Sequence, residues 1–333
     1  MKRYHILILL ICGCAGNKTD HFDGRRYHNY EKTGERGKVQ VIKWFFTRDK
    51  TPWPTDIPEN YGPAPVSRVS SGKLKVTFIN HASVLVQADG KNILFDPVWS
   101  YRVSPLSFIG PARVKKPGIR FKDLPQIDIV AISHDHYDHM DLPTLLRLKE
   151  KFDPFFITLS GCKKRLKTLK SRKIIELDWW QYSKIGKMEI HAVPARHSSG
   201  RSLTDRDTTL WGGFVILTSK GPVYFAGDTG YGIHFRMIRK KFGPMRFSML
   251  PIGAYKPRWF MKPVHMNPSD ALNAHFVLKS FRSMAIHFGT FPLADEGINE
   301  PIREMSVLLN SNRISPTVFI IPVEGVALNI PPL

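Results

Sequence analysis

From residue 73 onward, apolar and polar positions follow patterns typical of short strands separated by turns and helices. Runs of about four to eight residues, rich in Val, Ile and Phe, either alternate with polar residues or are apolar throughout, which indicates partly or fully buried strands. They occupy Leu74–Asn80, Ser83–Ala88, Asn92–Phe95, Ile127–Ser133, Phe155–Leu159, Lys173–Glu176, Met188–Ala192, Phe214–Thr218, Pro222–Ala226, Phe247–Pro251, Ser283–His287 and Thr317–Ile320. Apolar residues at helical spacing predict helices over Leu142–Lys151, Gly232–Phe242 and Pro268–Ser280.

The order of these elements predicts an α/β fold built from two mixed sheets. Hairpin-like pairs of strands come first, and strands alternate with helices later in the chain. Sheets must cover their apolar faces, and one stable solution packs two sheets face to face with helices outside. We therefore predict a four-layer αββα sandwich, and we place it over residues 71–333.

Residues 14–70 differ from the rest of the chain because they are polar, basic and rich in proline, with little periodicity. Such a composition is typical of a linker rather than of a packed domain. We interpret this segment as a tether followed by an extended arm that wraps the predicted sandwich domain. Trp44, Phe45 and Trp53 are the side chains that we expect to anchor the arm.

The first residues have the layout of a secretory signal. Lys2 and Arg3 precede the apolar run Ile6–Ile11, which is too short to span a bilayer. The sequence ICGC that ends this region resembles a bacterial lipobox, in which the second cysteine, Cys14, is lipidated. We predict a lipoprotein signal peptide over residues 1–13 and a lipid anchor at Cys14 in the cell envelope. Ala15 after the anchor favours the outer membrane, on its periplasmic face, in a Gram-negative cell.

Composition and charge narrow the class of partner. The 333-residue chain is 42% hydrophobic and 23% charged, as in ordinary globular proteins, but its net charge is +21. Such a surplus favours an anionic partner: a phospholipid surface, a phosphate-bearing substrate or nucleic acid. The basic residues are dispersed and form no recognisable nucleic-acid-binding module. Together with the expected anchor, this favours a phospholipid membrane as partner and not nucleic acid.

The sequence HDHYDH at His134–His139 concentrates metal-ligating side chains in one short loop. The apolar run before it predicts a buried strand, and Asp141 with Pro143 predicts the start of a helix after it. The ligands therefore lie between a strand end and a helix, where α/β proteins place their chemistry. Imidazole and carboxylate together suit zinc and similar first-row divalent ions.

Further candidate ligands occur where other predicted strands end. His197 follows the strand at Met188–Ala192, and Asp228 follows a strand that ends in a glycine-flanked turn. His287 ends the strand that begins at Ser283, and Asp96 follows the strand that ends at Phe95. This repeated placement predicts that the side chains meet at one edge of the sheets.

At this point the chain resembles the metallo-β-lactamase fold superfamily, whose five metal motifs occur here in order over about residues 72–325. The segment PIGAYKPRWFM at Pro251–Met261 is similar to one in the family of N-acylphosphatidylethanolamine-hydrolysing phospholipases D and their bacterial relatives. So are the segments NHASVLV, DPVWS and IHFGTF. The chain departs from the mammalian pattern at Lys256, where the mammalian enzyme has an acidic residue.

The resemblance implies the αββα fold and two zinc ions per chain. Carried over by position, it assigns three ligands to each ion and one residue to both: His134, His136 and His197; Asp138, His139 and His287; and the bridging Asp228. Asp138 and Asp228 are then also catalytic, because two nearby ions can hold a bridging hydroxide as nucleophile. Asp96 is expected behind the ligands, holding a histidine's second nitrogen; the alternative is a simple turn residue before Pro97.

Three further residues near the family-like segment have two interpretations each. His265 and Tyr255 are candidates for contacting the phosphate or donating a proton to the leaving group, and structural packing is the alternative. Arg258 is a candidate for binding the substrate phosphate or for pairing with a carboxylate inside the fold. For His81 we favour a hydrogen bond in the core or behind the ligands.

The sequence thus predicts a zinc-dependent phosphodiester hydrolase of the phospholipase D type. The sharpest form of the prediction is cleavage of N-acylphosphatidylethanolamine, or a related phospholipid, to phosphatidic acid and N-acylethanolamine. One alternative is a metal-dependent hydrolase of another bond, in a lactone or a sugar phosphate. Another is a non-catalytic envelope lipoprotein whose metal site is structural; the complete ligand set argues against it, because a structural zinc requires no second metal.

Overall fold

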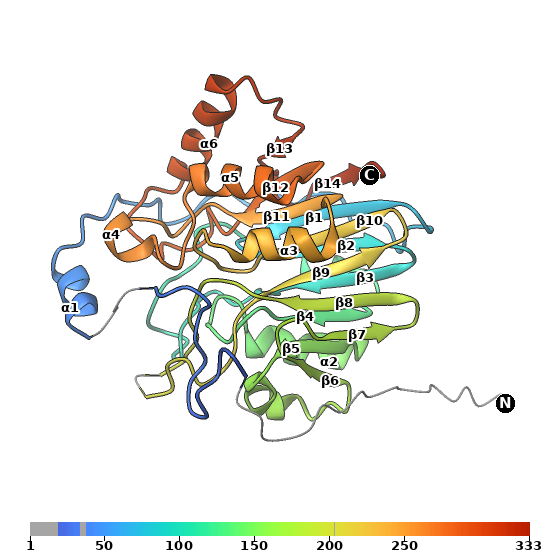
Figure 1. Ribbon diagram of the computed structural model, residues 1–333, viewed down its shortest axis with the longest axis horizontal. Coiled ribbons are helices and arrows are strands. Elements are labelled where there is room, and N and C mark those ends of the chain that lie inside the picture. Colours follow the sequence, from blue (N-terminus) through green and yellow to red (C-terminus); the bar gives the residue numbers. More distant parts are fainter. Residues whose placement is uncertain (1–18, 34–37, 203) are drawn as a thin grey trace.

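A computed structural model of the chain describes residues 19–33, 38–202 and 204–333, and two seven-stranded sheets dominate this part (Figure 1). The first sheet contains, in spatial order, β14 (Ala327–Ile330), β1 (Leu74–Asn80), β2 (Ser83–Ala88), β3 (Lys91–Phe95), β4 (Ile129–Ala131), β5 (Phe155–Leu159) and β6 (Ile174–Leu177). The second contains β13 (Phe319–Ile320), β12 (Arg282–Ile286), β11 (Phe247–Pro251), β10 (Gly221–Phe225), β9 (Gly213–Thr218), β8 (Met188–Val193) and β7 (Tyr182–Ile185).

Both sheets are mixed, and helices lie outside them. Strands pair antiparallel from β14 to β3 and from β7 to β10, and parallel from β3 to β6 and from β10 to β13. The helices α2 (Leu142–Phe152) and η2 (Cys162–Leu169) pack on the first sheet. The helices α3 (His234–Phe242), α5 (Pro268–Leu278) and α6 (Glu300–Ser311) accompany the second. The predicted four-layer αββα sandwich is confirmed.

Alternate residues of each inner strand face two different cores. Val84 and Val86 of β2 belong to the core between the sheets, whereas Leu85 packs with Leu145 of α2 on the outer side. The two sheets meet through pairs such as Phe95 and Phe225, whose rings stack at 4.5 Å. Because both faces are covered, these strands are apolar throughout, and that is why the sequence shows continuous hydrophobic runs.

The arm before β1 is not uniformly extended as expected. It contains α1 (Lys38–Phe46), which lies with α4 (Arg258–Met261) at the left of Figure 1. Trp44 stacks on Phe260 of α4 at 5.1 Å, and Trp53 donates its indole hydrogen to the carbonyl of Glu296 at 2.8 Å. Phe45 does not anchor the arm, because 67% of its surface is exposed.

The sequence patterns also missed several regular elements that the structure contains. They are the helices α1, α4 and α6, the 3-10 helices η1 (Phe121–Asp123) and η2, and the strands β7 and β14. Each of the two strands has only four residues, and only Ile185 in β7 and Ile330 in β14 are buried. Such short, half-exposed segments have too few apolar positions to show the two-residue alternation of a strand.

Candidate metal centre

The predicted ligands lie together in one buried cluster beyond the ends of β4, β8, β10 and β12. The ligand atoms of His134, His136 and His197 lie within 4.8 Å of one another, and so do those of Asp138, His139 and His287. Residues separated by up to half of the chain therefore form two adjacent groups. We call the first the His197 group and the second the His287 group.

Asp228 lies between these groups. Its Oδ2 atom is 3.7 Å from Nε2 of His197 and 3.3 Å from Nε2 of His139, and its Oδ1 atom is 3.1 Å from Nε2 of His287. One carboxylate thus faces histidines of both groups. This is the position required of a residue that bridges two metal ions.

Buried groups behind the ligands fix which ring nitrogen faces the cluster. Asp96 accepts a hydrogen bond from Nδ1 of His139 at 2.7 Å and another from the hydroxyl of Ser133 at 2.6 Å. That hydroxyl lies 2.9 Å from Nδ1 of His134, so its oxygen can accept the ring hydrogen. Nδ1 of His197 donates to the carbonyl of Val264 at 3.0 Å. In all three rings Nε2 is then left to face the cluster.

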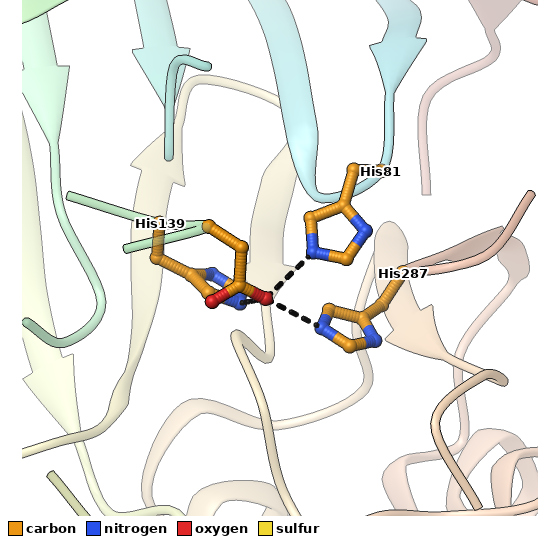
Figure 2. A group of neighbouring side chains, drawn as sticks. His81, His139 and His287 are labelled. Atoms are coloured by element: carbon orange, nitrogen blue, oxygen red, sulfur yellow. Dashed lines mark hydrogen bonds and ion pairs between the residues drawn. The ribbon is translucent and has the colours of Figure 1, made fainter. Parts of the chain in front are cut away.

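His81, for which the sequence favoured a hydrogen bond in the core or behind the ligands, is a member of the cluster itself. It lies in the turn between β1 and β2, and Figure 2 shows its ring converging with those of His139 and His287 on one carboxylate oxygen. That oxygen is Oδ2 of Asp138, at 2.9 Å from His81, 3.4 Å from His139 and 3.6 Å from His287. The sequence signal for His81 was the hairpin turn itself, which opens toward the same edge as the other ligands.

The backbone is strained at three residues of the centre. His81, Asp96 and His287 have φ angles of 44°, 38° and 59°, in the left-handed region that non-glycine residues seldom adopt. Each such conformation costs about 1–3 kcal/mol and persists where surrounding contacts enforce it. The amide of His287 donates to the carbonyl of His81 at 2.6 Å, which joins the two turns. Strain of this kind concentrates at functional sites.

Burial and charge set the protonation of the cluster. Burial lowers the pKa of His134 and of His136, so both rings are neutral at pH 7 and able to ligate a metal. Burial also lowers the pKa of His287, but the carboxylates of Asp228 and Asp138 outweigh it and raise the pKa to about 9. The pKa of Asp228 is held well below its usual value by His139 and His287, despite burial, so this carboxylate is ionised.

The donor atoms fit divalent metal ions. Nε2 of His134 lies 2.9 Å, and Nε2 of His197 3.3 Å, from Nδ1 of His136, so three ring nitrogens face one another. Nε2 of His139, Nε2 of His287 and Oδ1 of Asp228 are buried and lie within ion-pair distance of one another's side chains, but none of them makes a hydrogen bond of good geometry. Buried polar atoms normally have a partner, and cations would supply it here. Imidazole and carboxylate donors without thiolate suit zinc and other first-row divalent ions.

The three less certain residues have different surroundings. Nδ1 of His265 is 3.9 Å from Oδ2 of Asp228, so this ring lies at the cluster. Tyr255 is buried, and burial together with nearby Glu304 raises the pKa of its phenol. Arg258 pairs with Asp270 at 2.6 Å and donates to the carbonyl of His265 at 3.0 Å, so it has the carboxylate partner inside the fold that its structural alternative expects. A role of Tyr255 or Arg258 toward a substrate stays a prediction.

A family model described as "Beta-lactamase superfamily domain" matches residues 91–288, and it spans the HDHYDH motif, His197, Asp228 and His287. The chain belongs to the metallo-β-lactamase superfamily. This superfamily member is 37% identical over 256 residues to N-acyl-phosphatidylethanolamine-hydrolyzing phospholipase D 1 of Caenorhabditis elegans, with 73% of this chain and 71% of the relative covered. Its sequence-based identification and its fold are therefore confirmed.

One further relative and one solved structure have names that describe other kinds of protein. Outer membrane protein RomA of Klebsiella pneumoniae is 37% identical over 102 residues, which cover 31% of this chain and 75% of RomA. The crystal structure of CmlA, a diiron beta-hydroxylase from Streptomyces venezuelae, superposes with a TM-score of 0.57 at 22% identity, covering 78% of this chain and 54% of CmlA. At the level of a metal-dependent hydrolase of the metallo-β-lactamase fold, the predicted function is confirmed.

Proposed function

We propose that this protein is a zinc-dependent phosphodiester hydrolase of the phospholipase D type. Its substrate is N-acylphosphatidylethanolamine or a related phospholipid, and its products are phosphatidic acid and N-acylethanolamine. The observation that carries the proposal is Asp228, whose carboxylate faces both ligand groups as a two-ion centre requires. Similarity to the phospholipase D of C. elegans, at 37% identity over 73% of the chain, supports the choice of bond.

The residues of the centre have three roles: binding the ions, orienting the ligands and donating a proton. His134, His136 and His197 would hold one ion, Asp138, His139 and His287 would hold the other, and Asp228 would contact both. Such a pair of ions supplies a hydroxide nucleophile at neutral pH and stabilises the charge that develops on the phosphodiester oxygens. Asp96 and Ser133 keep the rings of His139 and His134 oriented. His265, beside Asp228, is the residue that we assign to proton donation to the leaving alcohol.

Several features support a membrane as the partner. The exposed apolar side chains of α1 include Val39, Ile42, Phe45 and Phe46, which are 73%, 55%, 67% and 80% exposed. Exposed apolar side chains can insert into the interface of a bilayer, and the net charge of +21 favours anionic lipids. Among the residues that the structure describes, no helix has both the length and the apolar character to cross a membrane.

We further propose that the protein is a lipoprotein of the cell envelope, anchored at Cys14. The lipobox-like sequence and the partial similarity to RomA support this location. Residues 1–18, including Cys14 and the expected signal peptide, lie outside the described part of the chain.

Hydrolysis in oxygen-18 water tests the proposed bond. We expect the label in phosphatidic acid and none in the N-acylethanolamine, because water attacks phosphorus directly. No transphosphatidylation product should form with an added primary alcohol, since no side-chain nucleophile is required. Label in the released alcohol, or an alcohol-exchange product, would contradict this mechanism.

A substrate panel and metal analysis separate the alternatives. Activity confined to lactones or sugar phosphates would refute the phospholipid substrate and leave the metal centre intact. Tightly bound metal without activity on any ester would favour a structural site. Metal analysis also distinguishes zinc from iron, the metal named for CmlA.

A further inference from the structure

The arm that precedes the catalytic domain reaches the metal centre through Asn29. The side-chain oxygen of Asn29 accepts a hydrogen bond from the amide of His197 at 3.0 Å, and its nitrogen donates to the carbonyl of His197 at 2.8 Å. The indole of Trp211 donates to the same oxygen at 3.0 Å. Two donors converge on this oxygen, so the orientation of the amide group is fixed.

His197 lies in a part of the chain that needs such a partner. It follows β8, which pairs with β9 only as far as Val193, so the sheet ladder cannot supply its backbone partners. Backbone groups in a buried turn must find hydrogen bonds elsewhere. Asn29 bonds both the amide and the carbonyl of His197, and the carbonyl of Val264 accepts from Nδ1 of its ring. The contacts of Asn29 and Val264 together fix the position and the direction of Nε2.

Neighbouring contacts hold the arm in place on both sides of Asn29. The amide of Tyr27 donates to the carbonyl of Asp207 at 2.8 Å. The carboxylate of Glu31 accepts from the amide of Ile233 at 2.6 Å, and the carbonyl of Lys32 accepts from Arg196 at 3.0 Å. The arm therefore packs along the turns that follow β8 and β10, which carry His197 and Asp228.

We propose that Asn29 is a positioning residue for the metal ion held by the His197 group. The arm thus completes one half of the centre, while the His287 group depends on Asp96 and His81, which lie outside the arm. This inference rests on the proposed two-ion centre. It predicts that loss of Asn29 affects the two ions unequally.

The test is a zinc titration of the full chain after removal of metal by a chelator, followed by competition with a chromophoric chelator. In Asn29→Ala, we expect one ion to bind about 10–100-fold more weakly, the usual effect of losing a group that orients a ligand, and the other to bind within about twofold of the native value. Asn29→Asp keeps the acceptor but loses the donor to the carbonyl, so its effect should be intermediate. His28→Ala, at the exposed neighbouring position, is the matched control and should leave both affinities unchanged.

The outcomes separate this inference from the proposed function. Equal weakening of both ions, or of neither, in Asn29→Ala would overturn the inference while two ions in the native chain uphold the function. A native chain that binds only one ion would refute the two-ion function and, with it, this inference, which predicts an unequal effect on two ions. Thermal unfolding of the metal-free variants, monitored by circular dichroism, checks that they fold. If Asn29→Ala does not fold, unequal weakening of the two ions in Asn29→Asp would support the inference, and equal weakening of both or of neither would overturn it.

Discussion

Asp228 is the residue on which the two ligand groups converge, since its oxygens face His197, His139 and His287. We expect Asp228→Ala to lose both bound ions and at least about 99% of the activity, because one carboxylate serves both sites. Metal content by mass spectrometry and hydrolysis of N-acylphosphatidylethanolamine measure this. Asp123→Ala is the control, since Asp123 forms only a surface pair with Arg120 and should change neither. Retained activity above about a hundredth of the native value would contradict the bridging role.

The sequence identified the candidate ligands but not all the residues that hold them. His134–His139 are recognisable because their types and spacing are local, and the others follow predicted strands. His81 has no local signal beyond its place in a hairpin turn, and Asn29 has none. Their partners, Asp138 and His197, lie far away in sequence, and only the folded sheets bring them together. A polar residue in a turn or an arm does not reveal its partner from sequence alone.

At the scale of elements, α1 is unusual because its apolar side chains face outward. Phe45→Glu with Phe46→Glu should leave folding intact, because both rings are exposed, and should weaken binding to anionic vesicles by at least about tenfold through lost apolar contact and added repulsion. Vesicle sedimentation measures this. The control replaces Val307 and Val323, also exposed, with glutamate and adds the same charge elsewhere. Equal vesicle binding by the two variants would refute α1 as the membrane contact.

The docking of the arm has a predicted pH dependence through His21. Burial lowers the pKa of this ring, but hydrogen bonds to Asp178 and Asp20 outweigh it and raise the pKa above 6.5. The charged ring therefore stabilises the fold below pH 6.5, and this contribution is lost as the pH rises through the raised pKa. The melting temperature of native protein should exceed that of His21→Gln by more at pH 6 than at pH 9. An equal difference at both pH values would show that protonation of His21 contributes nothing to the stability of the fold.

Helix α1 and the docked arm were also the elements that the sequence predicted least well. Helix α1 was missed because its apolar residues do not form a buried stripe. Sequence patterns detect a helix mainly through the contrast between a buried and an exposed face, and α1 lacks that contrast. By comparison, the strands next to the metal centre were placed to within two residues at each end, because both of their faces are buried.

For the whole molecule, the predicted architecture is confirmed, whereas the lipid anchor at Cys14 stays a prediction. Cys14→Ser should abolish acylation while the catalytic domain folds normally, leaving only the reversible binding of α1 to lipid. Mass spectrometry of the mature amino terminus and a high-salt wash of the membrane fraction measure this. Recovery of the native protein in unacylated, soluble form would replace the lipobox with an ordinary secretory signal.

The pairing of β14 with β1 has a consequence for how the protein is made. These are the last and the first strands in chain order, yet they are neighbours at the edge of one sheet. While the ribosome is still extending the chain, β1 has an open edge, and an open edge invites pairing with other chains. The β14–β1 pair can form only after β14 has been synthesised, so the edge of β1 stays open until then. Shortening the chain before β14 should therefore leave this edge open and increase aggregation during expression.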